Sequence, residues 1–213
     1  MSLLSTRGLS KSFAGLQAVQ NVDFDLPEGQ IRALIGPNGA GKTTFVGMLC
    51  GRTVPTSGAV LFDGQDISRL PAHKRINLGM AYTFQITSVF GNLGVYENVA
   101  LAARRRLVGA EVEPQVIAAL QKVGLHERVD QRAGSLSYGH QRLLEIAMGL
   151  VQNPRLLILD EPTQGLADGE IDAFKKLIRG LVSKTTILLI EHNMSVVMET
   201  ADMVSVLNFG EIL

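Results

Sequence analysis

The sequence predicts an α/β protein whose core is a parallel sheet covered on both faces, with an N-terminal antiparallel β subdomain and an inserted α-helical subdomain. Three observations predict this fold. The apolar runs 156–159 and 187–190 are short, bounded by polar turns, and flank a helical stretch at about 170–182, which is typical of buried parallel strands. Residues 19–26 alternate in polarity, which indicates a half-buried strand. From about 96 to 151 the apolar residues follow helical spacing.

The remaining elements follow from apolar runs and turn signals. In chain order we expect a strand over 19–26 with a turn after it, a strand over 31–35, a helix from 42 to about 49, a strand over 59–62 that ends in a hairpin turn at Asp63-Gly64, the helix near 170–182 and a last strand over 204–207. We therefore divide the chain into an α/β core with the β subdomain, residues 1–87 and 151–213, and a helical subdomain, residues 88–150.

The composition is that of a folded globular chain and excludes several classes of protein. Of the 213 residues, 46% are hydrophobic and 19% are charged, which argues against disorder. Lys and Arg number 20 and balance 20 Asp and Glu, which argues against a protein that binds nucleic acid through a basic surface. The one cysteine, Cys50, excludes a disulfide framework, and we expect it to be buried and inert.

Neither a signal peptide nor a membrane span is expected. Residues 1–7 lack the apolar segment of a signal peptide, and no apolar run approaches the roughly 20 residues that cross a bilayer. The four histidines have no metal-ligand spacing. If the protein serves a membrane, we expect it to act from outside the lipid.

Residues 36–43 form a phosphate-binding motif. They fit G-x-x-x-x-G-K-[ST] at every defined position, and they follow an expected strand and open an expected helix, as this motif requires. Glycines let successive backbone N–H groups face one centre, and the helix dipole adds positive potential there. We expect Lys42 to reach the β- and γ-phosphates and Thr43 to coordinate Mg²⁺. The expected phosphate-binding residues are Gly36, Pro37, Asn38, Gly39, Ala40, Gly41, Lys42, Thr43 and Thr44.

Three further segments carry groups suited to hydrolysis at the γ-phosphate of a nucleotide. The apolar strand 156–159 ends at Asp160, which can hold Mg²⁺ through water, and at Glu161, which can polarise an attacking water. Ser137 reads as an N-cap that opens a helix, another anion-binding feature. His192 follows the buried run 187–190. Each segment, taken alone, is also an ordinary turn, capped helix or strand end.

The ordered set resembles the ATP-binding-cassette (ABC) ATPases over the whole chain. The five motifs that carry the resemblance are the phosphate motif 36–43, Tyr82-Thr83-Phe84-Gln85, Leu136-Ser137-Tyr138-Gly139, Leu159-Asp160-Glu161-Pro162 and the late His192. The resemblance implies a P-loop ATPase core in which two cassettes pair head to tail. Each ATP is then held by the P-loop of one subunit and the serine-capped helix of the other.

The resemblance also implies a role for each site residue. Gln85 and Thr43 bracket Mg²⁺ and Asp160 holds its shell, while Glu161 is the general base. His192 contacts the γ-phosphate, and Ser137 and Gly139 bind the partner's ATP. Phe13 aligns with an aromatic residue that stacks on adenine, with a core Phe near the N-terminal strand as the alternative. The catalytic group expected is therefore Glu161, His192 and Gln85.

The segments 13–19, 82–85, 136–139 and 190–194 look like the ATPase subunits of branched-chain amino-acid and urea importers. The resemblance implies ATP and Mg²⁺ as cofactors and a second, identical or similar, cassette as partner. It also implies two membrane permease subunits, an indirect solute-binding protein and no nucleic acid. The expected location is the cytoplasmic face of the cell membrane, as a peripheral subunit. The transported solute and the direction of transport stay open, and a non-transporter or lipid-exporting cassette is the alternative.

The chain departs from the common family pattern at several positions. Tyr138 stands where Gly is usual and His140 where Gln is usual. Gly165 takes the place of a serine that, in the family, is expected to take part in communication between the two sites. Gly94 replaces a common Thr at the end of the apolar, non-periodic segment 86–96, which is either a permease-docking groove or an irregular core segment.

One basic run and two rival classes of protein remain to be considered. The run Arg104-Arg105-Arg106 is read as a solvated helix face, with docking to lipid head groups or an acidic partner as the sharper alternative. A cassette that acts on DNA or ribosomes usually carries coiled-coil insertions, a duplicated cassette or basic arms, and none is found. A P-loop kinase or GTPase is disfavoured by the Asp160-Glu161 pair and by the lack of an Asn-Lys-x-Asp motif.

Overall fold

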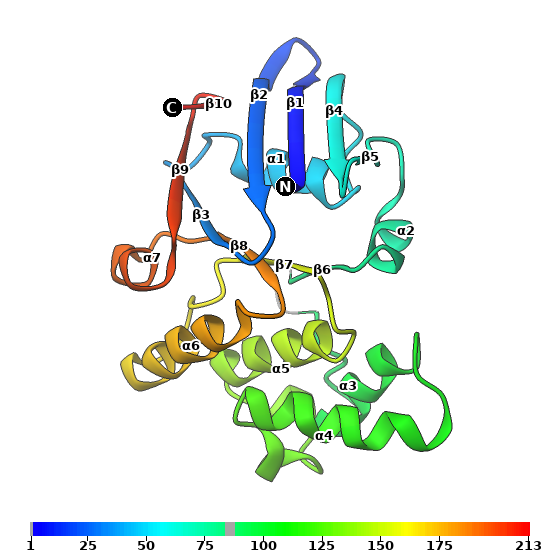
Figure 1. The fold of residues 1–213 in the computed structure, drawn as a ribbon. Helices are drawn as coiled ribbons and strands as arrows, with labels where there is room; N and C mark the ends of the chain where they lie inside the picture. The colour runs from blue at the N-terminus through cyan, green and yellow to red at the C-terminus, as the bar shows by residue number, and fades with distance from the viewer. Residues whose placement is uncertain (1, 84–87) are drawn as a thin grey trace.

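The computed structural model of the chain describes residues 2–83 and 88–213. A six-stranded sheet runs through the middle of the molecule, with a second, antiparallel sheet above it and a group of helices below it in Figure 1. The mixed α/β architecture with an antiparallel sheet and helical insertions confirms the predicted fold class.

The six-stranded sheet has the order β10-β9-β3-β8-β7-β6. Its strands are β3 (Ile31–Ile35), β6 (Met80–Tyr82), β7 (Leu156–Asp160), β8 (Thr186–Ile190), β9 (Met203–Asn208) and β10 (Glu211–Ile212). All neighbouring pairs are parallel except β10 with β9. Strand β3 therefore lies beside β8 although about 155 residues separate them in the chain, which brings their carboxyl ends to one edge.

The antiparallel sheet has the order β2-β1-β4-β5, with β1 (Ser2–Phe13), β2 (Leu16–Pro27), β4 (Ser57–Phe62) and β5 (Gln65–Asp66). Helix α1 (Lys42–Leu49) lies between the two sheets, because its buried side chains pack with both. Phe45 of α1 meets Phe24 of β2 edge to face, with ring centroids 5.6 Å apart. Packing on two sides holds the start of α1 against the end of β3.

The helices α3 (Val95–Ala103), α4 (Val112–Lys122) and α5 (Tyr138–Leu150) form the helical group, linked by the short 3₁₀ segments Gly109–Glu111, His126–Arg128 and Ala133–Ser135. Helix α6 (Asp168–Leu181) lies next to α5 in Figure 1, and α2 (Ala72–Asn77) and α7 (Met194–Thr200) lie at the edges of the core. Strand side chains alternate between the two cores: Leu157 and Leu159 face the helices, whereas Leu156 and Ile158 face α1. Among the helices in the described part of the chain, none has the length and hydropathy needed to cross a membrane.

Two sequence interpretations are settled by packing. Cys50 is buried, as predicted, and burial raises the pKa of its thiol to about 12. Residues 104–106 are exposed to solvent, as predicted, but they do not lie on a helix face. Helix α3 ends before them, and the guanidinium groups of Arg105 and Arg106 donate to the last carbonyls of α2, including His73 O at 2.7 Å and Ile76 O at 2.7 Å.

Candidate functional site

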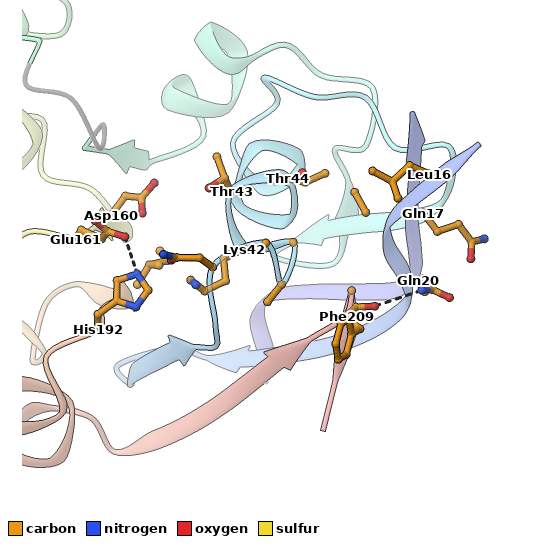
Figure 2. Close-up of a pocket in the computed structure, with 17 residues that line it drawn as sticks. Leu16, Gln17, Gln20, Lys42, Thr43, Thr44, Asp160, Glu161, His192 and Phe209 are labelled. Carbon is orange, nitrogen blue, oxygen red and sulfur yellow. Dashed lines mark hydrogen bonds and ion pairs between the residues drawn. The ribbon is translucent and has the colours of Figure 1, made fainter. Parts of the chain in front are cut away.

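The largest concentration of predicted site residues lies in one cleft at the carboxyl ends of β3, β7 and β8. The cleft has a volume of about 430 Å³, which suits a nucleotide-sized ligand. Figure 2 shows it from the side, with Asp160, Glu161 and His192 at one end, Lys42 at the centre, and Leu16, Gln17, Gln20 and Phe209 at the other. Parallel strands end at the same edge of a sheet, which is why residues so far apart in the chain meet here.

The glycine-rich turn before α1 is forced into its shape by its surroundings. Gly41 is the N-cap of α1 with φ of 102°, a left-handed conformation that glycine adopts at little cost. A Cβ at this position would also collide with the carbonyl oxygen of Ala18 in β2. Residues 38–44 consequently line the cleft with backbone and short side chains, and the amino end of α1 faces the space.

Lys42 is held inside the turn. Its Nζ donates to the carbonyl oxygens of Gly36 at 2.6 Å and Pro37 at 3.0 Å, and the residue is 8% exposed. Burial lowers the pKa of the Lys42 ammonium, and the nearby carboxylates of Glu161 and Asp160 oppose that shift. Thr43 and Thr44, the next residues of α1, also line the cleft (Figure 2). The cationic group is thus directed at the turn that would surround an anion.

Asp160 ends β7 and is almost fully buried. The phenol of Tyr82, on the neighbouring strand β6, donates to Asp160 Oδ2 at 2.9 Å. Burial raises the pKa of the Asp160 carboxyl, and the Tyr82 hydrogen bond acts in the opposite direction. Burial likewise raises the pKa of Tyr82, so its phenol keeps its proton and donates a hydrogen bond to Asp160. A carboxylate and the Thr43 hydroxyl in one cleft are oxygen donors of the kind that Mg²⁺ prefers, so these residues fit such an ion.

Glu161 and His192 form a direct pair. His192 Nε2 lies 2.7 Å from Glu161 Oε1, and both residues line the cleft (Figure 2). Glu161 has φ of 49°, and its backbone N–H donates to Ile190 O at 2.9 Å, which ties the end of β7 to the end of β8. A left-handed glutamate at a strand end is uncommon, and it is maintained here by that backbone bond.

Sequence reasoning missed the residue that organises this pair. Glu191 is 3% exposed, and its carboxylate accepts hydrogen bonds from the Thr163 N–H, the Thr163 hydroxyl, the His192 N–H and the Asn193 N–H. One buried carboxylate thus joins the loop after Glu161 to the segment that carries His192. The acidic residue after an apolar strand was visible in the sequence, but its partners were not.

Comparisons with known proteins agree with this geometry. The family model described as "ABC transporter" matches residues 19–164. The high-affinity branched-chain amino acid transport ATP-binding protein BraF of Pseudomonas aeruginosa is 41% identical, over 98% of this chain and 89% of its own length. LivG of Escherichia coli, a protein of the same description, is 38% identical over the same shares. The lipopolysaccharide export system ATP-binding protein LptB of Haemophilus influenzae is 32% identical over 100% of this chain and 90% of its own.

The chain belongs to the ABC transporter family. A solved structure agrees: the cassette MJ1267 in its ADP conformation has a TM-score of 0.92 and 27% sequence identity, over 100% of this chain and 90% of that one. The predicted resemblance to ABC transporter ATP-binding subunits is therefore confirmed.

The cassette keeps two predicted residues away from its own cleft. Ser137 is the N-cap of α5, accepting from the His140 N–H at 3.2 Å, and neither Ser137 nor Gly139 lines the cleft. Gln85 lies outside the described residues. The structure thus gathers residues 38–44, Asp160, Glu161 and His192, while Gly36 and Pro37 contribute the carbonyls that hold Lys42.

Phe13 is not among the described residues that line the cleft. It lies at the end of β1, 48% exposed, with Lys11 Nζ 4.9 Å from its ring centroid. Its reading as a buried core residue is therefore wrong, and its role toward adenine stays a prediction. Leu16 and Phe209, which are 72% and 82% exposed, line the far end of the cleft, and sequence reasoning missed both. Phe209 follows the predicted strand 204–207 and precedes Gly210, so an aromatic residue at the end of that strand was the available signal.

Proposed function

We propose that this cassette is the ATP-hydrolysing subunit of an importer for branched-chain amino acids or a similar small polar solute such as urea. The Glu161–His192 pair at the open end of the Lys42 turn is the observation that carries the proposal, because it joins a proton acceptor to a phosphate-binding cradle. The similarity to BraF and LivG supports the choice of solute.

Different residues bind the phosphates, hold Mg²⁺ and accept the proton. Residues 36–44 hold the phosphates through backbone N–H groups, the Lys42 ammonium and the Thr44 hydroxyl. When a phosphate binds, Lys42 gives up its hydrogen bonds to Gly36 O and Pro37 O and donates to phosphate oxygens. Thr43, Asp160 and Gln85 supply oxygen atoms to Mg²⁺, which neutralises phosphate charge when bound. Glu161 accepts a proton from the attacking water, and His192 orients that carboxylate and faces the γ-phosphate.

The adenine is expected at the far end of the cleft. Leu16 and Phe209 offer exposed apolar surface there, and Phe13 lies in the same turn region at the end of β1. A base sandwiched against such side chains removes apolar area from water without a specific hydrogen bond. The proposal assigns these three residues to the base and the residues of the Lys42 turn to the phosphates.

Completion of the site requires a second cassette. Ser137 is exposed at the amino end of α5, outside its own cleft, where it is available to another molecule's ATP, whereas Gly139 is buried against Leu166 and its role stays a prediction. We therefore propose a head-to-tail pair of cassettes, identical or similar, with residues 88–150 as the helical subdomain and residues 1–87 with 151–213 as the ATP-binding core. The pair would sit on the cytoplasmic face of the membrane against two permease subunits fed by a solute-binding protein.

The test is the variant Glu161→Gln. A glutamine keeps the shape and can hydrogen-bond His192, but it cannot accept the proton, so hydrolysis should fall by roughly 10²-fold or more while ATP still binds. Gel filtration of this variant with Mg-ATP should give a dimer. A persistent monomer, both alone and with a related cassette from the same operon, would contradict the pairing. A strong preference for GTP over ATP in turnover would contradict the assignment of the nucleotide.

A lipid-exporting cassette is the second candidate. The 32% identity to the lipopolysaccharide export protein LptB favours it, although BraF and LivG are more similar. Purification of the cassette from membranes together with its multi-spanning partners separates the two. Stimulation of its ATPase rate by an amino-acid-loaded binding protein supports import, and stimulation by a lipid supports export.

A further inference from the structure

The amino end of α5 carries a chain of hydrogen-bonding groups that the proposed function does not use. His140 Nδ1 lies 2.9 Å from Ser137 Oγ, and His140 Nε2 lies 3.6 Å from Glu170 Oε1 in the first turn of α6. The other oxygen of Glu170, Oε2, accepts from the Ala167 N–H at 2.8 Å. One imidazole thus stands between the serine hydroxyl and a carboxylate that holds the loop leading back to Glu161.

The residues that depart from the common family pattern, Tyr138, His140 and Gly165, lie together at this contact. A Cβ on Gly165 would lie 2.5 Å from Tyr138 Cδ1, so the tyrosine ring occupies the space beside this loop that a serine would need. A Cβ on Gly139 would lie 2.7 Å from Leu166 Cδ2. Tyr138, His140 and Gly165 therefore all meet where the start of α5 packs on residues 163–167. This packing fixes the position of the His140 ring relative to α6.

Ser137 has one hydroxyl hydrogen, and the imidazole competes for it. When Nδ1 carries no proton, the hydroxyl donates to Nδ1 at 2.9 Å, and its oxygen already accepts from the His140 N–H. When Nδ1 carries a proton, Nδ1–H donates to Oγ and the hydroxyl hydrogen is released toward solvent. The charged group that faces the ring across the contact is Glu170, whose Oε1 lies 3.6 Å from Nε2.

We propose that His140 is a positioning residue for Ser137: with Glu170, it decides whether the Ser137 hydroxyl hydrogen is available to a phosphate oxygen of the partner's nucleotide. This inference rests on the proposed function, in which Ser137 binds ATP held by another cassette. A ring that is doubly protonated keeps Nε2–H on Glu170, donates Nδ1–H to Ser137 and leaves the hydroxyl free to donate to the phosphate. Through His140 and Glu170, Ser137 is also connected to Ala167, although position 165 lacks the serine that is common in the family.

The experiment uses the Glu161→Gln chain with Mg-ATP and measures dimer formation by sedimentation velocity. His140→Ala should raise the ATP concentration for half-maximal dimerisation by roughly 10-fold if the ring donates Nδ1–H to Ser137, the effect of losing one hydrogen bond, and a fall of similar size would show that the ring instead takes the hydroxyl hydrogen. His140→Gln should restore most of the loss, because its amide N–H can donate to Ser137 Oγ. Binding of a fluorescent ATP analogue to the dilute monomer should stay within about 2-fold of the parent in each variant, since the residues lie outside the chain's own cleft. The matched control is His126→Ala, an exposed histidine in the same group of helices.

The double variant Ser137→Ala/His140→Ala decides whether one residue acts through the other. If His140 works through Ser137, the double variant should dimerise no worse than Ser137→Ala alone. Additive effects, or normal dimerisation of His140→Ala beside a defective Ser137→Ala, would overturn this inference and leave the proposed function intact. Normal dimerisation of Ser137→Ala would instead contradict the shared nucleotide site itself.

Discussion

The imidazole of His192 and the carboxylate of Glu161 lie in direct contact, with Nε2 2.7 Å from Oε1, although 31 residues separate them in the chain. The side chain of Glu161 is 17% exposed and that of His192 is 43% exposed, so the pair is open to the cleft on the histidine side. The Glu191 carboxylate supports the pair from behind by holding Thr163 and the His192 N–H. The carboxylate therefore has a defined direction before any nucleotide enters.

His192→Ala should lower the hydrolysis rate by about 10- to 100-fold with little change in ATP affinity. The substitution removes the group that orients Glu161 but leaves the Lys42 turn and the base-binding end of the cleft in place. Steady-state ATPase assays at several ATP concentrations separate the two effects. Loss of ATP binding in this variant, with an unchanged circular dichroism spectrum, would argue against the orienting role.

Asp160→Asn should abolish hydrolysis and raise the thermal stability of the nucleotide-free chain. Burial raises the pKa of the Asp160 carboxyl above its ordinary value of 3.8, so the ionised form costs folding free energy at neutral pH. An asparagine can still accept the Tyr82 hydrogen bond without carrying charge. We expect the melting temperature to rise by about 3 °C at pH 7.

The difference in melting temperature between Asp160→Asn and the parent protein should change with pH in one direction. The folded state binds the Asp160 proton more tightly than the unfolded state, so the cost is present above the raised pKa and disappears as pH falls toward 3.8. The melting temperatures of the two proteins should therefore draw together as the pH is lowered from 7 toward 4. Curves that separate further on acidification would contradict the assignment.

Gly165→Ser should destabilise the chain, with a fall in melting temperature of about 5 °C. Gly165 has φ of 79°, where a side chain costs roughly 1–2 kcal/mol, and the new Cβ would lie 2.5 Å from Tyr138 Cδ1. Adding Tyr138→Gly should recover the steric part of the loss but not the backbone part. Gly169→Ser is the control, because nothing lies within 4 Å of a Cβ at that position. An equal loss at both glycines would remove the steric explanation.

Arg75→Leu should cost about 3 kcal/mol of unfolding free energy, measured by urea denaturation. Arg75 is 1% exposed, and its guanidinium donates to Met48 O and Leu49 O at the end of α1, to Leu70 O and to Ser68 O. Leucine fills similar space but leaves buried carbonyls without donors. The exposed Arg69, changed to Leu, should stay within about 0.5 kcal/mol of the parent. Equal effects of the two substitutions would contradict the capping role.

Several elements could be predicted from the sequence because they depend on residues that are close together in the chain. The predicted strand 31–35 and helix 42–49 coincide with β3 and α1, because the apolar run and the glycine-rich turn between them are encoded within 20 residues. Strand β2 extends three residues before and one after its prediction, since its pairing with β1 continues past the alternating stretch. Asp160, Glu161 and His192 were identified because each lies at or just after the end of a buried strand, and strand ends in a parallel sheet share one edge.

The sequence by itself determined the phosphate motif, the buried strands and the family, since these depend on neighbouring residues in the chain. Only the tertiary structure decided which side chains meet: Glu191 with Thr163, Arg105 with the end of α2, His140 between Ser137 and Glu170, and Phe209 at the cleft. Each of these contacts joins residues from different helices, strands or loops, so it forms only when those elements pack together. A polar residue looks the same in sequence whether it faces solvent or a distant backbone carbonyl, and packing alone selects its partner.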